Sequence, residues 1–64
     1  MYEEAIDRPI RVLHLEDSAV DHELVQRALQ RSGMDFSIER AETLDEFTRM
    51  IASHSFDAIV ADYR

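Results

Sequence analysis

The hydrophobic positions of this chain fall into short blocks that predict three strands separated by two helices. Residues 10–15 are rich in aliphatic side chains on both faces and end at acidic residues, which is typical of a strand covered on both sides. Phe36 and Ile38 alternate with polar residues, the pattern of a half-buried strand near a sheet edge. Residues 56–61 are almost continuously apolar and predict a third strand that is buried on both faces.

The first helix is predicted between the first two strands. Ser18 followed three residues later by Asp21 is a helix-start signature, and apolar residues then recur at helical spacing. Gly33, the only glycine, stands where a left-handed C-cap is favoured. We therefore expect a helix from about residue 19 to about residue 32.

The second helix is predicted by the same kind of signal. Thr43 followed by Glu46 repeats the capping-box spacing, and the helix is expected to end near Ser53. Apolar residues on one stripe of each helix are expected to form the core. These residues are Leu24, Ala28, Phe47 and Ile51.

The order of these elements predicts the fold class. Strands alternating with helices through short connections indicate an α/β protein with right-handed crossovers and a parallel sheet. The first and third strands are expected to be neighbours, with the second outside, so the three-stranded sheet has the order 2-1-3. Residues 1–9 are polar and contain the only proline, so we expect a flexible lead-in followed by one folded segment, residues 10–64.

Composition narrows the classes of function. Fourteen acidic residues against seven basic ones, all of them arginine, give a formal net charge of -7, so nucleic acid is not expected as a partner. No apolar run approaches the roughly 20 residues that cross a bilayer, and the first residues are acidic where a secretory signal is basic. We expect a cytoplasmic protein without membrane association, and the absence of cysteine fits a reducing compartment.

Acidic residues gather at the predicted carboxyl ends of neighbouring strands. Glu16 and Asp17 follow the first strand, and Asp62 follows the third. Ligands of open parallel sheets bind outside the carboxyl ends of the strands, and carboxylates packed there are stabilised by a hard divalent cation. Mg²⁺ is favoured because few protein ligands are offered. The acidic pair could also simply begin the helix, with Asp17 or Ser18 as its N-cap.

Two segments of the chain resemble the receiver domain of two-component response regulators. The segment that looks like the first strand and acidic pair of a receiver is Val12-Leu13-His14-Leu15-Glu16-Asp17-Ser18. The segment that looks like its third strand and phosphoacceptor is Phe56-Asp57-Ala58-Ile59-Val60-Ala61-Asp62-Tyr63-Arg64. The resemblance covers about residues 9 to 64 in order and spacing, and it implies the β-α-β-α-β half of a flavodoxin-like receiver.

The resemblance also implies a role for each acidic residue. Asp62 would be the phosphoacceptor in Mg²⁺-dependent phosphoryl transfer from a sensor histidine kinase or a phosphotransfer protein. Asp17 would bind Mg²⁺ directly, Glu16 would occupy the other acidic position and often act through water, and the backbone carbonyl of Arg64 would be a third metal ligand. Such chemistry depends mainly on positioning and charge neutralisation.

The sequence departs from the receiver pattern after the third strand. The family has a serine or threonine after a fourth strand and a lysine after a fifth, and this chain stops before both, so full switching is not expected. We expect a signalling module and not an enzyme. The main alternative is a binding-only or dimerisation module, because the far edge of the third strand invites a homodimer or completion by another segment. A phosphohydrolase is less favoured, because such enzymes usually have aspartate where this chain has Arg64.

The three histidines are given structural roles. His14 lies within the first strand and is expected to be partly buried and hydrogen-bonded, because no other histidine is close in sequence on that face. His22 and His54 are expected on solvated surfaces of the two helices. None of the three histidines is therefore predicted to take part in the chemistry of the acidic site.

Overall fold

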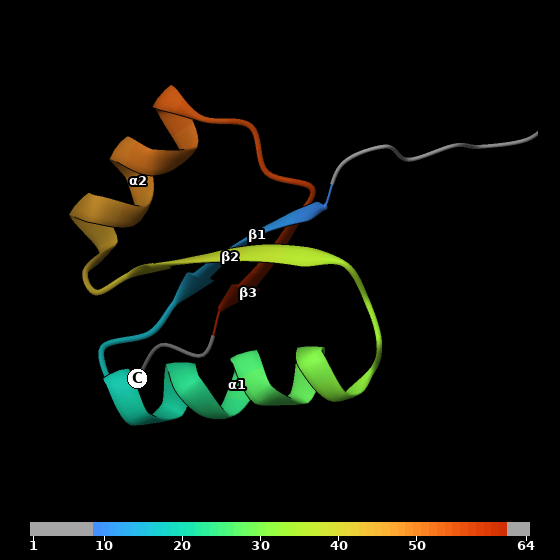
Figure 1. The fold of residues 1–64 in the computed structure, drawn as a ribbon. Coiled ribbons are helices and arrows are strands. Elements are labelled where there is room, and N and C mark those ends of the chain that lie inside the picture. Colours follow the sequence, from blue (N-terminus) through green and yellow to red (C-terminus); the bar gives the residue numbers. More distant parts are fainter. Residues whose placement is uncertain (1–8, 62–64) are drawn as a thin grey trace, which may run out of the picture.

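Three strands and two helices alternate along residues 9–61, the part of the chain that the computed structural model describes (Figure 1). Predictions that fall on residues 1–8 and 62–64 lie outside it. The elements are β1 (Ile10–Leu15), α1 (Ala19–Arg31), β2 (Phe36–Ala41), α2 (Leu44–Ser53) and β3 (Ala58–Ala61). The strands form one parallel sheet in the order β2-β1-β3. The predicted α/β class and the strand order 2-1-3 are confirmed.

Both helices begin at the capping residues that the sequence predicts. The Ser18 hydroxyl accepts a hydrogen bond from the N–H of Asp21 at 3.2 Å, and the Thr43 hydroxyl accepts one from the N–H of Glu46 at 3.1 Å. Each hydroxyl pairs with an N–H that the first turn of a helix leaves unbonded. Beyond α1, Gly33 has a φ of 78°, a left-handed conformation that glycine adopts without steric cost.

The two helices lie on opposite faces of the sheet (Figure 1). Because side chains alternate along a strand, β1 directs Leu13 and Leu15 to one face and His14 to the other. The face under α2 is apolar. Its buried residues are Leu13, Leu15 and Ala41, and the side chains packed against them are Phe47, Met50 and Phe56. The face that carries His14 is the one covered by α1.

The helix stripe predicted to form the core is largely exposed. Leu24 is 58% exposed, Ile51 is 42% exposed, and Ala28 is also exposed. Only Phe47 of the four predicted residues packs against the core. The partly buried apolar residues of α1 are Val25 and Leu29. The prediction was wrong because helical spacing identifies apolar stripes but not which of two overlapping stripes faces the sheet.

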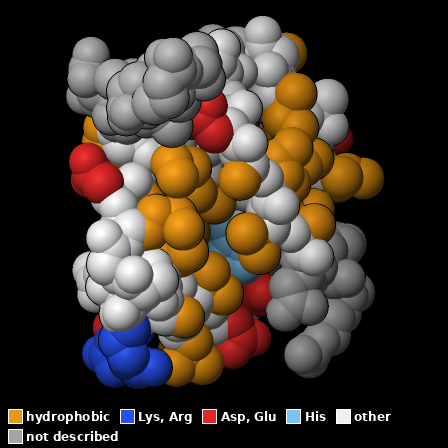
Figure 2. All heavy atoms as spheres, turned by 90° about the vertical axis from the view of Figure 1, so that its right-hand side faces the viewer, with side chains coloured by type: hydrophobic (Ala, Val, Ile, Leu, Met, Phe, Trp, Pro, Cys, Tyr) orange, Lys and Arg blue, Asp and Glu red, His pale blue; other side chains and the backbone are white. Residues whose placement is uncertain are grey.

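β3 is shorter and more exposed than the sequence predicts. It begins at Ala58 instead of Phe56 and lies at the edge of the sheet with β1 beside it. The helices pack mainly over β1 and β2, so Ile59 is 51% exposed and only Val60 in this strand is partly buried. The prediction that the third strand is buried on both faces is therefore wrong for β3 as the structure describes it. Figure 2 shows hydrophobic side chains at the surface of the molecule.

Candidate functional site

The carboxyl ends of β1 and β3 lie side by side, as the predicted acidic site requires. Leu15 pairs with Ala61 in the last register of the β1–β3 ladder. On its other side Leu15 pairs with Ala41 of β2, and the N–H of Glu16 donates to the carbonyl of Ala41 at 2.9 Å. Glu16 and Asp17 therefore stand at the edge where β1 ends, just before α1 begins.

Glu16 is turned into the protein, with only 3% of its surface exposed. Its Oε2 accepts a hydrogen bond from the N–H of Ser18 at 3.2 Å, and its Oε1 lies 3.9 Å from Nε2 of His14. The guanidinium of Arg40 donates to the backbone carbonyl of Glu16 at 3.3 Å. Burying a carboxylate is costly without a hydrogen-bond partner, and among the described residues the N–H of Ser18 supplies one to this carboxylate.

Asp17 has the opposite environment. Its side chain is exposed, and no other residue in the described part of the chain forms a hydrogen bond or an ion pair with its carboxylate. Exposed carboxylate oxygens are ligands that Mg²⁺ prefers. The two neighbouring acids therefore differ in what they can do, because Asp17 is available to a cation from solvent and Glu16 is fixed inside.

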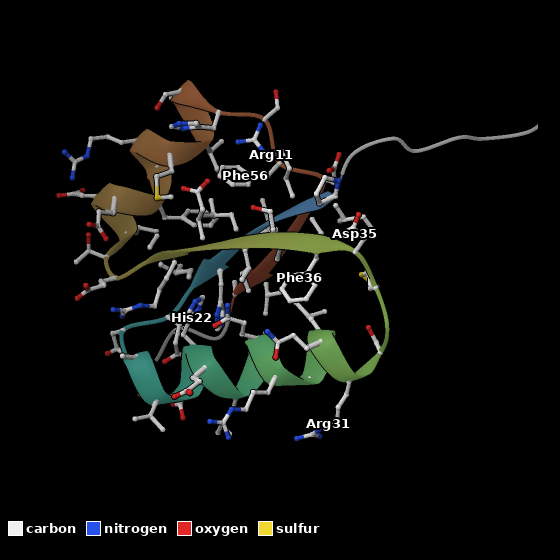
Figure 3. All side chains as sticks on the ribbon, viewed as in Figure 1. Arg11, His22, Arg31, Asp35, Phe36 and Phe56 are labelled. Carbon is white, nitrogen blue, oxygen red and sulfur yellow. The ribbon has the colours of Figure 1, made fainter. Side chains whose placement is uncertain are left out.

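A pair of histidines lies beside Glu16, beneath α1. His14 is fully buried, and its Nδ1 is 3.0 Å from Nδ1 of His22. Figure 3 shows His22 on the side of α1 that faces the sheet. The predicted hydrogen bond of His14 is confirmed, although its burial is complete instead of partial. The prediction that His22 lies on a solvated helix surface is wrong, because the first turn of α1 lies over the end of β1 and brings His22 to His14.

The surroundings of His22 lower its pKa below the ordinary value of 6.5. Burial is the largest cause, because a charged imidazolium loses solvation there. His14 and Arg40 act in the same direction, and the nearby Glu16 partly opposes them. These surroundings therefore favour the neutral form of His22, in which one ring nitrogen donates a hydrogen bond and the other accepts.

The predicted metal ligands are only partly inside the described structure. Glu16 and Asp17 lie at the predicted edge, whereas Asp62 and the backbone carbonyl of Arg64 lie outside residues 9–61. Within that range no group of three or more histidine, aspartate or glutamate side chains is placed to hold a metal ion. The exposed oxygen donors of Asp17 fit Mg²⁺, whereas Glu16, the other described member of the predicted set, is buried.

The sequence prediction missed two residues of the site, His22 and Arg40. Arg40 lies in register with His14 across the β1–β2 ladder, and it brings a positive charge to an edge that was expected to be purely acidic. Counting along both strands from the pair of Ile10 and Phe36 would have placed Arg40 there. His22 follows the N-cap by one turn, a position from which a side chain points back along the helix axis toward its start.

Comparisons with known proteins gave no match to this chain: no family model matches it, and neither curated proteins nor solved structures do. Within residues 9–61 no helix is long and apolar enough to cross a bilayer. The observations that bear on function are therefore the acidic edge of the sheet and the side chains around it.

Proposed function

We propose that this chain is a phosphoacceptor receiver module of a two-component phosphorelay, in which Asp62 accepts a phosphoryl group from a sensor histidine kinase or a phosphotransfer protein. The observation that carries the proposal is the last pair of the β1–β3 ladder, Leu15 with Ala61. In the sequence, acidic residues follow directly on both strands, Glu16 after Leu15 and Asp62 after Ala61. Ligands of open parallel sheets bind at this edge.

Each acidic residue at this edge would have a separate role in phosphoryl transfer. A carboxylate oxygen of Asp62 attacks phosphorus, the bond from phosphorus to the donor histidine nitrogen breaks, and the imidazole leaves. A bound Mg²⁺ would supply positive charge that neutralises the phosphoryl oxygens. Asp17, through its exposed carboxylate, would hold the cation together with Asp62 and the carbonyl of Arg64. Glu16, held by the N–H of Ser18, adds a fixed negative charge behind it.

A magnesium titration followed by amide NMR tests the metal site. We expect residues 16–18 and 62–64 to shift at concentrations on the order of tens of millimolar, because few protein ligands are offered. Asp17→Asn should abolish the response. Asp45→Asn, the same change at an exposed position of α2, should leave it intact. An unresponsive wild type, or an unchanged response in Asp17→Asn, contradicts the proposed site.

A second candidate function is a binding or dimerisation module, and the exposed edge of β3 favours it. Within residues 9–61, β3 has β1 on one side and no strand on the other, and Ile59 is 51% exposed. The backbone groups of an edge strand can pair with a strand of another molecule. Two copies of β3 around a two-fold axis would join two sheets through an antiparallel seam.

Sedimentation tests this second candidate. We expect a dimer that Ile59→Lys converts to a monomer, because a charge would enter the seam. Ile51→Lys is the control, because Ile51 is an exposed isoleucine too, with 42% of its surface accessible, but lies on α2. A monomer whose β3 amides are already protected from hydrogen exchange would rule the edge out as an interface.

A further inference from the structure

The two histidine rings beneath α1 lie edge to edge. Their Nδ1 atoms are 3.0 Å apart, their centroids are 5.2 Å apart, and their planes are inclined by only 27°. The rings are thus nearly coplanar, with the two Nδ1 atoms between them, as in an N–H···N hydrogen bond. One Nδ1 must carry a proton and the other must accept it. His14 and His22, when both are neutral, therefore have opposite tautomers.

The position of Glu16 indicates which of the two rings donates the Nδ1–Nδ1 hydrogen bond. Nε2 of His14 lies 3.9 Å from Oε1 of Glu16, and the two side chains are 0% and 4% exposed. This Nε2 has no hydrogen-bond partner within the described residues. A bare lone pair would be repelled by a carboxylate in so poorly solvated a place, whereas an N–H is attracted to it. His14 therefore carries its proton on Nε2 and accepts at Nδ1 from His22.

We propose that His22, acting through His14, is a positioning residue that fixes the Glu16 carboxylate beside the magnesium site. The inference rests on the proposed function, because it concerns the same site. His22 donates to His14, the Nε2–H of His14 faces Oε1 of Glu16, and the N–H of Ser18 holds Oε2. This series of contacts keeps Glu16 turned inward and leaves Asp17 as the carboxylate that faces solvent.

A fixed Glu16 strengthens cation binding at Asp17. The two negative charges attract a cation together as long as the Glu16 carboxylate is held at the edge. Without the N–H of His22, the ring of His14 can turn or change its tautomer, and Oε1 of Glu16 loses the dipole that faces it. Partners of metal ligands commonly change metal affinity by about 10- to 100-fold. Because His22 acts through a further contact, we expect a loss of about threefold to tenfold.

His22→Leu and His22→Asn form a matched pair of variants. Leucine is similar in size and has no N–H, whereas the asparagine amide can place an N–H near the position of Nδ1. His22→Leu should weaken Mg²⁺ binding about threefold to tenfold, and His22→Asn should restore most of it. His54→Leu removes an exposed histidine and should have the wild-type affinity. Urea unfolding of each variant verifies that it is folded.

A Glu16→Gln background separates positioning from a general loss of packing. With no carboxylate to hold, His22→Leu should weaken Mg²⁺ binding no further, whereas a purely structural role would weaken it equally in both backgrounds. Nitrogen-15 NMR of the wild type at about pH 8, where ordinary histidines are neutral, reads the tautomers directly. We expect the Nε2–H form at His14 and the Nδ1–H form at His22.

Three results would overturn the inference, and they are distinguishable. Equal Mg²⁺ affinity of the wild type and His22→Leu, in a chain whose binding is lost in Asp17→Asn, overturns the inference alone. An Nδ1–H tautomer at His14 also overturns it and leaves the proposed function standing. No Mg²⁺ response in the wild type overturns the proposed function and this inference together.

Discussion

The backbone N–H of Arg11 donates to a carboxylate oxygen of Asp57 at 2.8 Å, and the N–H of Asp57 donates to the carbonyl of Arg11 at 2.7 Å. This reciprocal pair joins β1 to the residue just before β3. The guanidinium of Arg11 also lies 5.4 Å from the ring centre of Phe56, and Figure 3 shows the two labelled side chains near each other above the sheet. The start of β3 is thus fixed by side-chain contacts with β1.

Removing the Asp57 carboxylate should destabilise the fold. We expect Asp57→Ala to lower the free energy of unfolding by about 1 kcal/mol, because the N–H of Arg11 loses a charged acceptor at a partly solvated place. Asp57→Asn should cost less, since its amide oxygen can still accept. Urea unfolding measures both. Glu39→Ala, at an exposed acidic position of β2, is the control and should change little. Equal losses at the two positions would refute this role of Asp57.

The N-cap hydroxyl of α2 should contribute more to the free energy of unfolding than a hydroxyl inside the same helix. Thr43→Ala should cost about 1 kcal/mol of unfolding free energy, because the N–H of Glu46 loses its acceptor. Thr48→Ala is the matched control. The Thr48 hydroxyl donates to the carbonyl of Leu44 at 2.9 Å, a carbonyl that the helix can pair without it. Denaturant unfolding followed by circular dichroism should separate the two, and identical costs would count against the cap.

Substitution of Gly33 should destabilise the fold because of its backbone conformation alone. Its φ is 78°, and a Cβ built there meets no atom within 4 Å. Gly33→Ala should therefore destabilise the chain by about 1 kcal/mol through left-handed strain and not through a clash. Gly33→Asn should cost less, because asparagine tolerates this conformation. If alanine instead stabilised the chain, the entropy of the unfolded state would outweigh the strain.

The stability of the chain should fall as the pH is lowered through the ordinary histidine range. Burial, His14 and Arg40 lower the pKa of His22 in the folded chain below the ordinary value of 6.5. As the pH falls below that value, the unfolded chain takes up a proton that the folded chain does not yet bind. Stability is then lost until the pH reaches the lowered pKa, and this contribution does not change further below it.

Urea unfolding between about pH 8 and about pH 5 measures this loss. His22→Gln should have a shallower slope of stability against pH than the wild type. His54→Gln, which changes an exposed histidine after α2, should keep the wild-type slope. A wild-type slope in His22→Gln would mean that the loss comes from other groups.

Features set by neighbouring residues could be predicted from the sequence. The caps at Ser18 and Thr43 and the turn at Gly33 each involve residues within three or four positions of one another, so a local pattern specifies them. The start of β3 could not be predicted in this way. Its anchor, Asp57, has its partner 46 residues away at Arg11, and no local pattern contains that pairing.

Some features of the candidate site could also be predicted from the sequence, and others could not. The strand order follows from the alternation of strands and helices, and it places Glu16 and Asp17 at the carboxyl edge. Glu16 is buried in contacts with His14 and with Arg40 of β2, whereas Asp17 is exposed. Those contacts depend on strand register and on the rotation of α1 about its axis, and the apolar pattern of α1 specified neither.

The most direct test of the phosphoacceptor role is to find where a phosphoryl group goes. The chain is incubated with acetyl phosphate and Mg²⁺, the acyl phosphate is reduced with borohydride, and the reduced residue is located by mass spectrometry. Labelling is expected to be slow, because all seven basic residues are arginine and no lysine is present to bind the phosphoryl oxygens. We expect Mg²⁺-dependent labelling at Asp62, which Asp17→Asn should strongly reduce and Asp62→Asn should abolish. Labelling that persists in Asp62→Asn, or that lies on another residue, would contradict the phosphoacceptor role of Asp62.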